Sequence, residues 1–185
     1  PSRTVGGDFY DFILIEKDKR LGMVIADASG KGMPAALLMA NLQATMRGSA
    51  FNSNSVSEAV SAVNKLLLGS TDSKTFVTLF YAIYDTINHT LTYCNAGHNP
   101  PYLVDAAGEI KTLEVGGPLA AAFSWSSYGE ETVPMGPGQR LVIYTDGVTE
   151  AADKTDEQFG EERLIALIKN WRAEQSKAFI DQVVN

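Results

Sequence analysis

The sequence predicts an α+β fold, a layered α/β sandwich whose β-sheets are largely antiparallel. Its apolar, β-favouring runs come as neighbouring pairs separated by short turns, which is typical of hairpins. The predicted helices also come in pairs, and they do not alternate strictly with strands as they do in parallel-sheet proteins. With 185 residues, 45% of them hydrophobic, the chain is long enough for one sizeable core and is expected to form a single domain.

The N-terminal quarter is expected to form a hairpin followed by a helix. Apolar runs at residues 9–15 and 21–26 flank a charged tip, as the two strands of a hairpin do. A helix is expected over residues 33–47, with Pro34 in its first turn, where the missing N–H costs nothing.

A second helix is predicted by both its start signal and its apolar stripe. Ser55 and Glu58 have the S-x-x-E spacing of a capping box. The residues that follow repeat at helical spacing and would face the core: Val56, Ala59, Val60, Val63 and Leu67.

The second half of the chain begins with strands and ends with helices. Residues 76–84 are almost entirely apolar and predict a central strand, on which residues 91–94 pair back. Residues 102–104 and 110–113 predict another hairpin, and residues 141–145 a short buried strand. Two further helices are expected. The first is indicated by the face that Leu164, Leu167, Ile168 and Trp171 share, and the second by the apolar residues Phe179, Ile180, Val183 and Val184.

Charge and cysteine content exclude several function classes. The net charge of −7 disfavours binding to nucleic acid or to an anionic membrane surface. Cys94 is the sole cysteine, so the chain has neither an internal disulfide nor a cysteine-based zinc site. No apolar run approaches the roughly 20 residues that span a bilayer, and no signal peptide is visible. These features favour a cytoplasmic protein without membrane contact.

Three aspartates stand beside small residues at the ends of apolar runs. Asp8 follows Gly6-Gly7, Asp27 ends a run before Ala28, and Asp146 precedes Gly147. Converging carboxylates without histidine or cysteine suit Mg²⁺ or Mn²⁺ better than zinc. An aspartate beside glycine is also common in plain turns, so the spacing alone leaves a metal site and a set of turns both open. A nucleotide-binding enzyme would need a phosphate-cradling loop, which we do not find.

Five motifs, in this order, resemble the bacterial branch of the protein phosphatase 2C-like family (PPM type). That branch includes the sporulation stage II protein E phosphatase and regulators of stress sigma factors. The resemblance implies an α-β-β-α sandwich, with two packed sheets flanked by helix pairs and a dinuclear metal centre at one edge. The motifs are Val5-Gly6-Gly7-Asp8-Phe9-Tyr10-Asp11, the segment from Asp27-Ala28-Ser29-Gly30 to Ala36, Asn95-Ala96-Gly97-His98-Asn99-Pro100-Pro101, Gly116-Gly117-Pro118-Leu119 and Tyr144-Thr145-Asp146-Gly147-Val148-Thr149-Glu150-Ala151.

The resemblance also implies roles for particular residues in binding two Mn²⁺ or Mg²⁺ ions. Asp27 would bridge the ions and Asp146 would bind the first, so that both act in catalysis through metal-bound water. Asp8 and the backbone carbonyl of Ala28 would bind the second ion. The expected reaction is hydrolysis of phosphoserine or phosphothreonine on a small regulatory protein, such as an anti-sigma-factor antagonist.

Further positions are candidates for substrate binding and regulation. Lys31 and Ser29 are candidates for binding the substrate phosphate, although a lysine in such a loop is more often simply solvated. The two helices after Asp27 are expected to act as a switch driven by an upstream sensor or receiver domain. A homodimer formed through upstream helices fits the same picture. Positions of these switch helices are Met33, Leu37, Val56, Val60 and Val63.

The family pattern includes a strand at each end that residues 1–185 are expected to lack. It continues, beyond Asn185, with a strand opened by an Asp-Asp pair that supplies a further ligand, and it begins with a strand before Pro1. We therefore expect residues 1–185 to be one phosphatase domain, shortened at both ends and excised from a longer protein that contains a sensor. Weak activity is expected from this segment, and the alternative is an inactive phosphatase fold that binds a partner in signalling.

Overall fold

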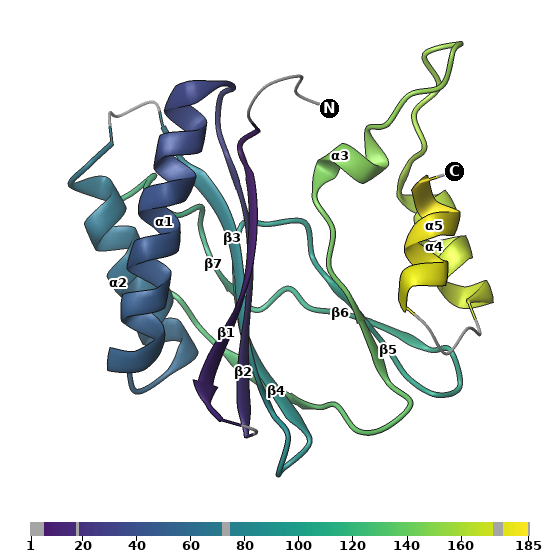
Figure 1. Ribbon diagram of the computed structural model, residues 1–185, viewed down its shortest axis with the longest axis horizontal. Coiled ribbons are helices and arrows are strands. Elements are labelled where there is room, and N and C mark those ends of the chain that lie inside the picture. Colours follow the sequence, from purple (N-terminus) through teal and green to yellow (C-terminus); the bar gives the residue numbers. More distant parts are fainter. Residues whose placement is uncertain (1–5, 18, 72–74, 172–175, 185) are drawn as a thin grey trace.

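The computed structural model describes residues 6–17, 19–71, 75–171 and 176–184, which form two β-sheets stacked face to face (Figure 1). Within these residues the larger sheet has strand order β1-β2-β3-β4-β7, with β8 beside β4: β1 (Asp8–Glu16), β2 (Arg20–Ala28), β3 (Val77–Asp85), β4 (Thr90–Ala96), β7 (Gly116–Gly117) and β8 (Glu131–Pro134). The smaller sheet has the order β6-β5-β9: β5 (Tyr102–Val104), β6 (Ile110–Thr112) and β9 (Arg140–Val142).

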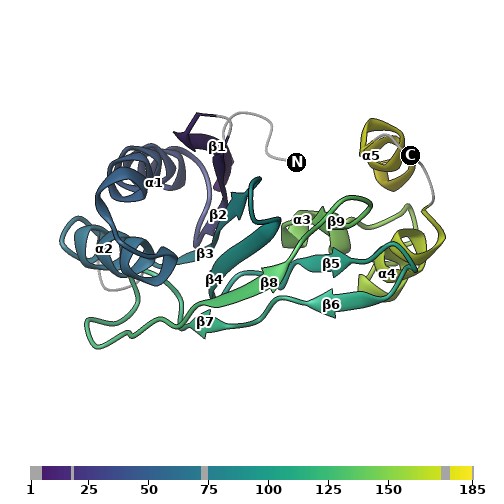
Figure 2. The same cartoon turned by 90° about the horizontal axis from the view of Figure 1, so that it is seen from below.

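Helices cover both outer faces of this sandwich (Figure 2). The pair α1 (Met33–Asn52) and α2 (Val56–Leu68) lies on the larger sheet, whereas α4 (Glu161–Asn170) and α5 (Ser176–Val184) lie beside the smaller sheet. A single turn of helix, α3 (Asp146–Thr149), follows β9. The layers are therefore α-β-β-α, as predicted. No helix in the described part of the chain combines the length and apolarity needed to cross a bilayer.

The buried side chains fall into separate clusters that correspond to the contacts between layers. Along β3, Leu79 and Tyr81 pack with α1 and α2, whereas Phe80 and Ala82 pack toward the smaller sheet. Along β5, Leu103 faces the larger sheet, and its neighbours face Leu164 and Ile168 of α4. The period of two along each strand thus supplies both faces of each sheet with core residues.

Most predicted elements are confirmed, but some boundaries are wrong. Helix α1 continues to Asn52, five residues beyond the predicted end at residue 47. Strand β9 ends at Val142 rather than at residue 145 and is only half-buried. β7, β8 and α3 lie outside the predicted elements. The capping box is also altered, because Ser55 Oγ accepts from the Glu58 N–H but the Glu58 carboxylate accepts from the N–H of Asn54.

One face of β1 carries exposed apolar side chains. In the hairpin register Tyr10 lies opposite Ile25 and Phe12 lies opposite Met23, and both β2 residues pack against the core between the sheets. Yet Tyr10, Phe12 and Leu14 are 73%, 59% and 69% exposed. The smaller sheet therefore does not extend over β1, which lies at the edge of the larger sheet.

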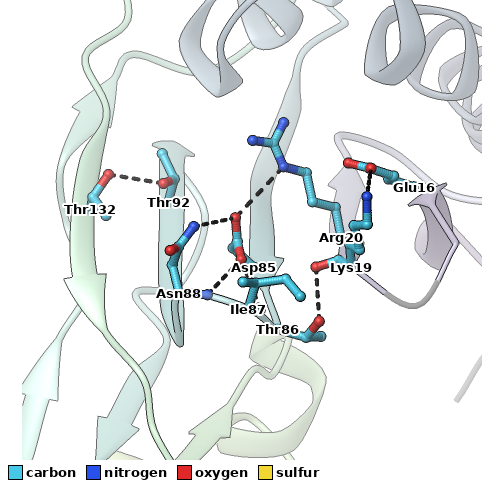
Figure 3. A network of polar contacts seen from close by, with 9 residues as sticks. All are labelled: Glu16, Lys19, Arg20, Asp85, Thr86, Ile87, Asn88, Thr92 and Thr132. Carbon is cyan, nitrogen blue, oxygen red and sulfur yellow. Dashed lines mark hydrogen bonds and ion pairs between the residues drawn. The ribbon is translucent and has the colours of Figure 1, made fainter.

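A network of polar contacts lies at the end of the larger sheet that carries the β1–β2 and β3–β4 turns (Figure 3). Asp85 Oδ1 accepts the backbone N–H groups of Ile87 and Asn88 at 2.9 and 2.8 Å, and its other oxygen lies 3.8 Å from Arg20. Beside it, Lys19 pairs with Glu16 at 2.6 Å. Each of these carboxylates has a donor or a cation close by, so the turns of both hairpins are electrostatically satisfied.

Candidate metal centre

The hairpin register brings Asp8 and Asp27 side by side. Asp8 opens β1, and it pairs directly with Asp27, the penultimate residue of β2. Residues directly opposite each other in an antiparallel pair point to the same face, with Cβ atoms about 5 Å apart. Both carboxylates therefore project from the same edge of the larger sheet, on the side of the smaller sheet.

Asp146 reaches the same place from the smaller sheet. The chain leaves β9, and Asp146 is the first residue of α3. Its neighbour Thr145 donates a hydrogen bond to Asp8 Oδ2 at 3.1 Å, which ties the two sheets together at this point. The three aspartates line one open cleft of about 580 Å³, together with Gly6, Gly7, Ala28, Ser29, Gly30, Lys31, Gly147 and Glu150.

The carboxylates in this cleft destabilise one another as anions. Burial, followed by the charges of Asp8 and Asp146, raises the pKa of Asp27 from 3.8 to about 6. Like charges placed at short range in a partly desolvated site have this effect. A bound cation would offset both the desolvation and the repulsion, so the electrostatics of the cleft favour cation binding.

The donor atoms around the cleft fit a hard divalent ion. All of the candidate ligands are oxygens, which Mg²⁺ and Mn²⁺ prefer. A Cβ placed on Gly7 would lie 3.2 Å from both the Ala28 carbonyl oxygen and Asp27 Oδ1, so these two oxygens face the space that glycine leaves open. In the described part of the chain, no three carboxylate, imidazole or thiol side chains gather closely enough to hold one ion by themselves. Backbone oxygens and water would have to complete each coordination shell.

His98 holds the two halves of the site in position. It is buried, and its Nε2 lies 3.0 Å from the Tyr144 carbonyl oxygen, two residues before Asp146. Its Nδ1 lies 2.8 Å from the hydroxyl of Thr78, the residue paired with Asp27 across β2 and β3. Because a carbonyl only accepts, Nε2 donates to it, and the neutral ring then accepts from Thr78. Burial lowers the pKa of His98, which keeps the ring neutral.

The backbone of His98 also fixes the turn after β4. Its N–H donates to Asn95 Oδ1 at 2.7 Å, and its carbonyl accepts from Asn95 Nδ2 at 3.0 Å. His98 therefore has a structural role in this turn. Its bridge between the sheets was not predicted, because neither Thr78 nor Tyr144 is near His98 in the sequence.

The two candidate phosphate ligands have different surroundings. Ser29 Oγ accepts the backbone N–H of Phe76 at 2.9 Å, so this hydroxyl already helps to join the loop after β2 to the start of β3. Lys31 is exposed and lines the cleft. Its charge is therefore better placed than the Ser29 hydroxyl to meet an anion that enters the cleft.

The predicted switch positions divide between surface and core. Met33 and Leu37 of α1 are exposed, whereas Val56, Val60 and Val63 of α2 are buried against the larger sheet. Helix α1 is also tied to β1 by a two-pronged ion pair. Arg47 donates from Nε to Asp11 Oδ2 at 2.7 Å and from a terminal nitrogen to Oδ1 at 2.9 Å. The strand that carries Asp8 is thus linked directly to the helix.

Comparison with known proteins agrees with the resemblance inferred from the motifs. The family model described as Stage II sporulation protein E (SpoIIE) matches residues 17–185. The chain belongs to this family. Protein IcfG of Synechocystis sp. is 33% identical over 192 residues, covering 89% of this chain and 30% of IcfG. The phosphoserine phosphatase RsbU of Bacillus subtilis is 32% identical over 152 residues, covering 81% of this chain and 44% of RsbU. The chain thus spans less than half the length of these relatives.

Solved structures of similar proteins confirm the fold. The SiaA-PP2C domain of Pseudomonas aeruginosa superimposes with a TM-score of 0.81 at 22% identity, covering 100% of this chain and 75% of that chain. RsbX, solved in complex with magnesium, gives a TM-score of 0.75 at 18% identity, covering 99% of this chain and 81% of that chain. The α-β-β-α arrangement predicted for this SpoIIE-family chain is therefore the PP2C-like fold.

Proposed function

We propose that this SpoIIE-family chain hydrolyses phosphoserine or phosphothreonine on a protein substrate and depends on Mn²⁺ or Mg²⁺. The observation that carries the proposal is the meeting of three carboxylates, from both sheets, around one open cleft. Two of its curated relatives, RsbU and RsbP of Bacillus subtilis, are phosphoserine phosphatases. The magnesium bound to RsbX supports the choice of metal.

Within this proposal, the chain's own residues hold and orient two ions. The Asp27 carboxylate interacts electrostatically with both Asp8 and Asp146, which suits a bridging ligand. Asp146 would bind one ion, and Asp8 and the Ala28 carbonyl the other. Bound there, the ions would polarise the phosphoryl group and lower the pKa of an attacking water. Thr145 would keep Asp8 oriented through its hydrogen bond to Oδ2.

The entrance of the cleft supplies positive charge for the substrate. Lys31 lies on its lining, and α1 begins two residues later. The first turn of α1 contains no acidic residue. Its N-cap is Gly32, which has no side chain that could accept from the N–H groups of this turn. Free N–H groups and the helix dipole at such an end attract anions. We propose that Lys31 and this helix end orient the phosphate, with Ser29 in a minor role.

The wider setting is proposed from the relatives. RsbU and IcfG are both more than twice as long as the part that matches, so a further domain such as a sensor or receiver fits the same architecture here. The proposed substrate is a small regulatory protein, and the proposed location of the reaction is the cytoplasm. The switch role of α1 and α2 and a homodimer are parts of the same proposal.

Phosphate release from a phosphoserine peptide tests the function directly. We expect hydrolysis in the presence of Mn²⁺ or Mg²⁺, none with EDTA, and more than about 100-fold less in Asp27→Asn with either metal. Asp85→Asn, a carboxylate exchange at the far end of the same sheet, is the matched control and should retain activity. A protein that binds phosphopeptide but releases no phosphate under any metal condition would instead be the inactive partner-binding module.

A further inference from the structure

A charged contact joins the strand that carries Asp8 to helix α1. Figure 1 shows α1 lying alongside β1, and the two elements are in contact. Side chains on this face of β1 alternate with that of Asp8, and Asp11 is the polar one among them. The apolar residues on the same face are Phe9, Ile13 and Ile15. Arg47 of α1 donates to both oxygens of Asp11, at 2.7 and 2.9 Å, and such a two-pronged pair fixes where the strand lies along the helix.

The Asp11 carboxylate is held from both elements. Its Oδ1 also accepts the backbone N–H of Phe12 at 2.9 Å, so the side chain is fixed to its own strand. The pKa of Asp11 is lowered from 3.8, first of all by the hydrogen bond from Arg47 and less strongly by one from Gln43. Gln43 stands four residues before Arg47, on the same side of α1. The Asp11 side chain is 14% exposed, so this pair is better shielded from water than an ordinary surface ion pair.

Other restraints on Asp8 are few. Among the described strands, β1 pairs with β2 alone, and Asp8 is its first residue. The next two side chains on the face of Asp8, Tyr10 and Phe12, are largely exposed, so packing on that face does little to hold the strand. Asp11 lies three residues from Asp8, about 10 Å along the strand. The position of Asp8 therefore depends on the contacts that β1 makes with α1.

We propose that Arg47 and Asp11 are positioning residues of the metal centre, whose ion pair holds the start of β1 against α1 and so keeps the Asp8 carboxylate beside Asp27. The inference rests on the proposed function, in which Asp8 binds one of two ions. Without the pair, Asp8 samples positions farther from Asp27, and a bound ion has to draw it back. Loss of the pair therefore weakens the binding of metal but changes the fully loaded centre little.

The Mn²⁺ dependence of p-nitrophenyl phosphate hydrolysis tests the inference. Arg47→Met removes both hydrogen bonds and keeps an unbranched side chain. We expect the Mn²⁺ concentration for half-maximal activity to rise about threefold to tenfold, which is less than the roughly 10–100-fold that follows loss of a direct partner of a metal ligand. In contrast, kcat at saturating Mn²⁺ should stay close to that of the wild type. Calorimetric titration with Mn²⁺, at a temperature where both proteins are folded, should show the same loss of affinity.

Three further variants show whether the ion pair itself is responsible. Arg47→Lys keeps the charge without the two-pronged geometry, so its Mn²⁺ requirement should lie between those of the wild type and Arg47→Met. Adding Asp11→Asn to Arg47→Met should raise the requirement no further, because two residues that act through one contact are not additive. Arg20→Met is the matched control. Arg20 is 54% exposed, close to the 52% of Arg47, and it pairs with Asp85 at the turn end of the same hairpin. This control should need no more Mn²⁺ than the wild type.

The outcomes separate the inference from the function on which it rests. If Arg47→Met unfolds more easily but needs no more Mn²⁺ than the wild type, the pair is purely structural although the protein is a phosphatase. An equal rise in Arg47→Met and Arg20→Met would also overturn the inference, because loss of any ion pair in the hairpin would then suffice. If the wild-type protein neither binds Mn²⁺ nor hydrolyses p-nitrophenyl phosphate with it, the proposed function fails and the inference fails with it.

Discussion

Near the two ends of the β1–β2 hairpin, the fold shifts the pKa of an aspartate in opposite directions. At the turn end, Asp85 on the neighbouring strand accepts hydrogen bonds from two backbone N–H groups. The bond from the Asn88 N–H is the main reason that the pKa of Asp85 is held below 3.8. At the cleft end, burial and two neighbouring carboxylates raise the pKa of Asp27 to about 6. One end therefore stabilises its anion within the chain, and the other end does not.

In the folded protein the carboxylates at the cleft end cost stability, whereas Asp85 at the turn end contributes to it. Structural carboxylates are surrounded by donors, whereas those of a metal site are left to repel one another until an ion binds. Removing a carboxylate at the turn end should thus lower stability and leave activity unchanged, whereas removing one at the cleft end should lower activity without lowering metal-free stability.

Asp27→Asn is expected to have the largest effect on activity. Metal-dependent hydrolysis of a phosphoserine peptide should fall by more than about 100-fold, because even the outer partners of metal ligands cost about 10–100-fold. Metal-free stability should instead rise by about 1 kcal/mol at neutral pH, since the repulsion with Asp8 and Asp146 is removed. Phosphate release and urea unfolding with EDTA measure the two effects.

The pH dependence of that stability gain has a definite sign. The raised pKa of Asp27 means that its protonated form fits the folded protein, so its contribution is most favourable below 3.8 and is lost as pH rises through about 6. The variant should therefore exceed the wild type above pH 6 and match it near pH 4. A variant that is less stable than the wild type at pH 7 would contradict the contrast.

His98→Phe tests the bridge between the sheets. It leaves a buried carbonyl at Tyr144 and a hydroxyl at Thr78 without their partner, and it should cost about 1–3 kcal/mol of unfolding free energy. Because the bridge sets the position of Asp146 relative to Asp27, Mn²⁺ affinity should also fall by about tenfold. Calorimetric titration at a temperature where the variant is folded measures the affinity. Loss of stability with unchanged Mn²⁺ affinity would limit His98 to a packing role.

Gly7→Ala has a smaller effect and a close control in the same hairpin. The new Cβ would lie 3.2 Å from Asp27 Oδ1 and from the Ala28 carbonyl, so it should weaken Mn²⁺ binding several-fold. Gly22→Ala meets Ile15 Cδ1 at 3.3 Å, a similar crowding at the far end. It should disturb packing and leave Mn²⁺ affinity unchanged. Equal losses of affinity in both variants would show that crowding anywhere in the hairpin is enough.

Asp85→Ala should have the smallest effect, confined to stability. The folded state lowers the pKa of Asp85, so its stabilising contribution is present above 3.8 and disappears as pH falls further. At pH 7 the variant should unfold at a lower urea concentration than the wild type. Below pH 4 the unfolding free energies of the two proteins should converge. Phosphate release should be unaffected. A drop in activity at full metal occupancy would mean that the two ends are coupled.

Much of the fold follows from sequence patterns that act locally. The β1–β2 hairpin is marked by two apolar runs around a charged tip, and its register follows once the turn is placed, which brings Asp8 opposite Asp27. Helix α2 is marked by Ser55 and its apolar stripe. The short β8 has a single buried residue, Val133, and such a pattern is too weak to predict a strand.

The rest depends on contacts between distant residues. Near Asp146 the sheets are joined by hydrogen bonds of His98 and Thr145, whose partners are Tyr144, Thr78 and Asp8. Nothing local in the sequence gives these pairings. The exposed face of β1 is similar, because the apolar run at residues 9–15 does not show which of its side chains another sheet covers, and the smaller sheet leaves Tyr10, Phe12 and Leu14 uncovered.

Titration calorimetry with Mn²⁺ tests most directly whether the cleft of Asp8, Asp27 and Asp146 is a metal centre. The wild-type chain, Asp27→Ala and the far-end control Asp85→Ala should be compared at pH 7. We expect saturable binding by the wild type and by Asp85→Ala, and loss of that binding in Asp27→Ala. Equal binding by all three proteins, or no binding by any of them, would contradict the account and favour a phosphatase fold that binds a partner without catalysis.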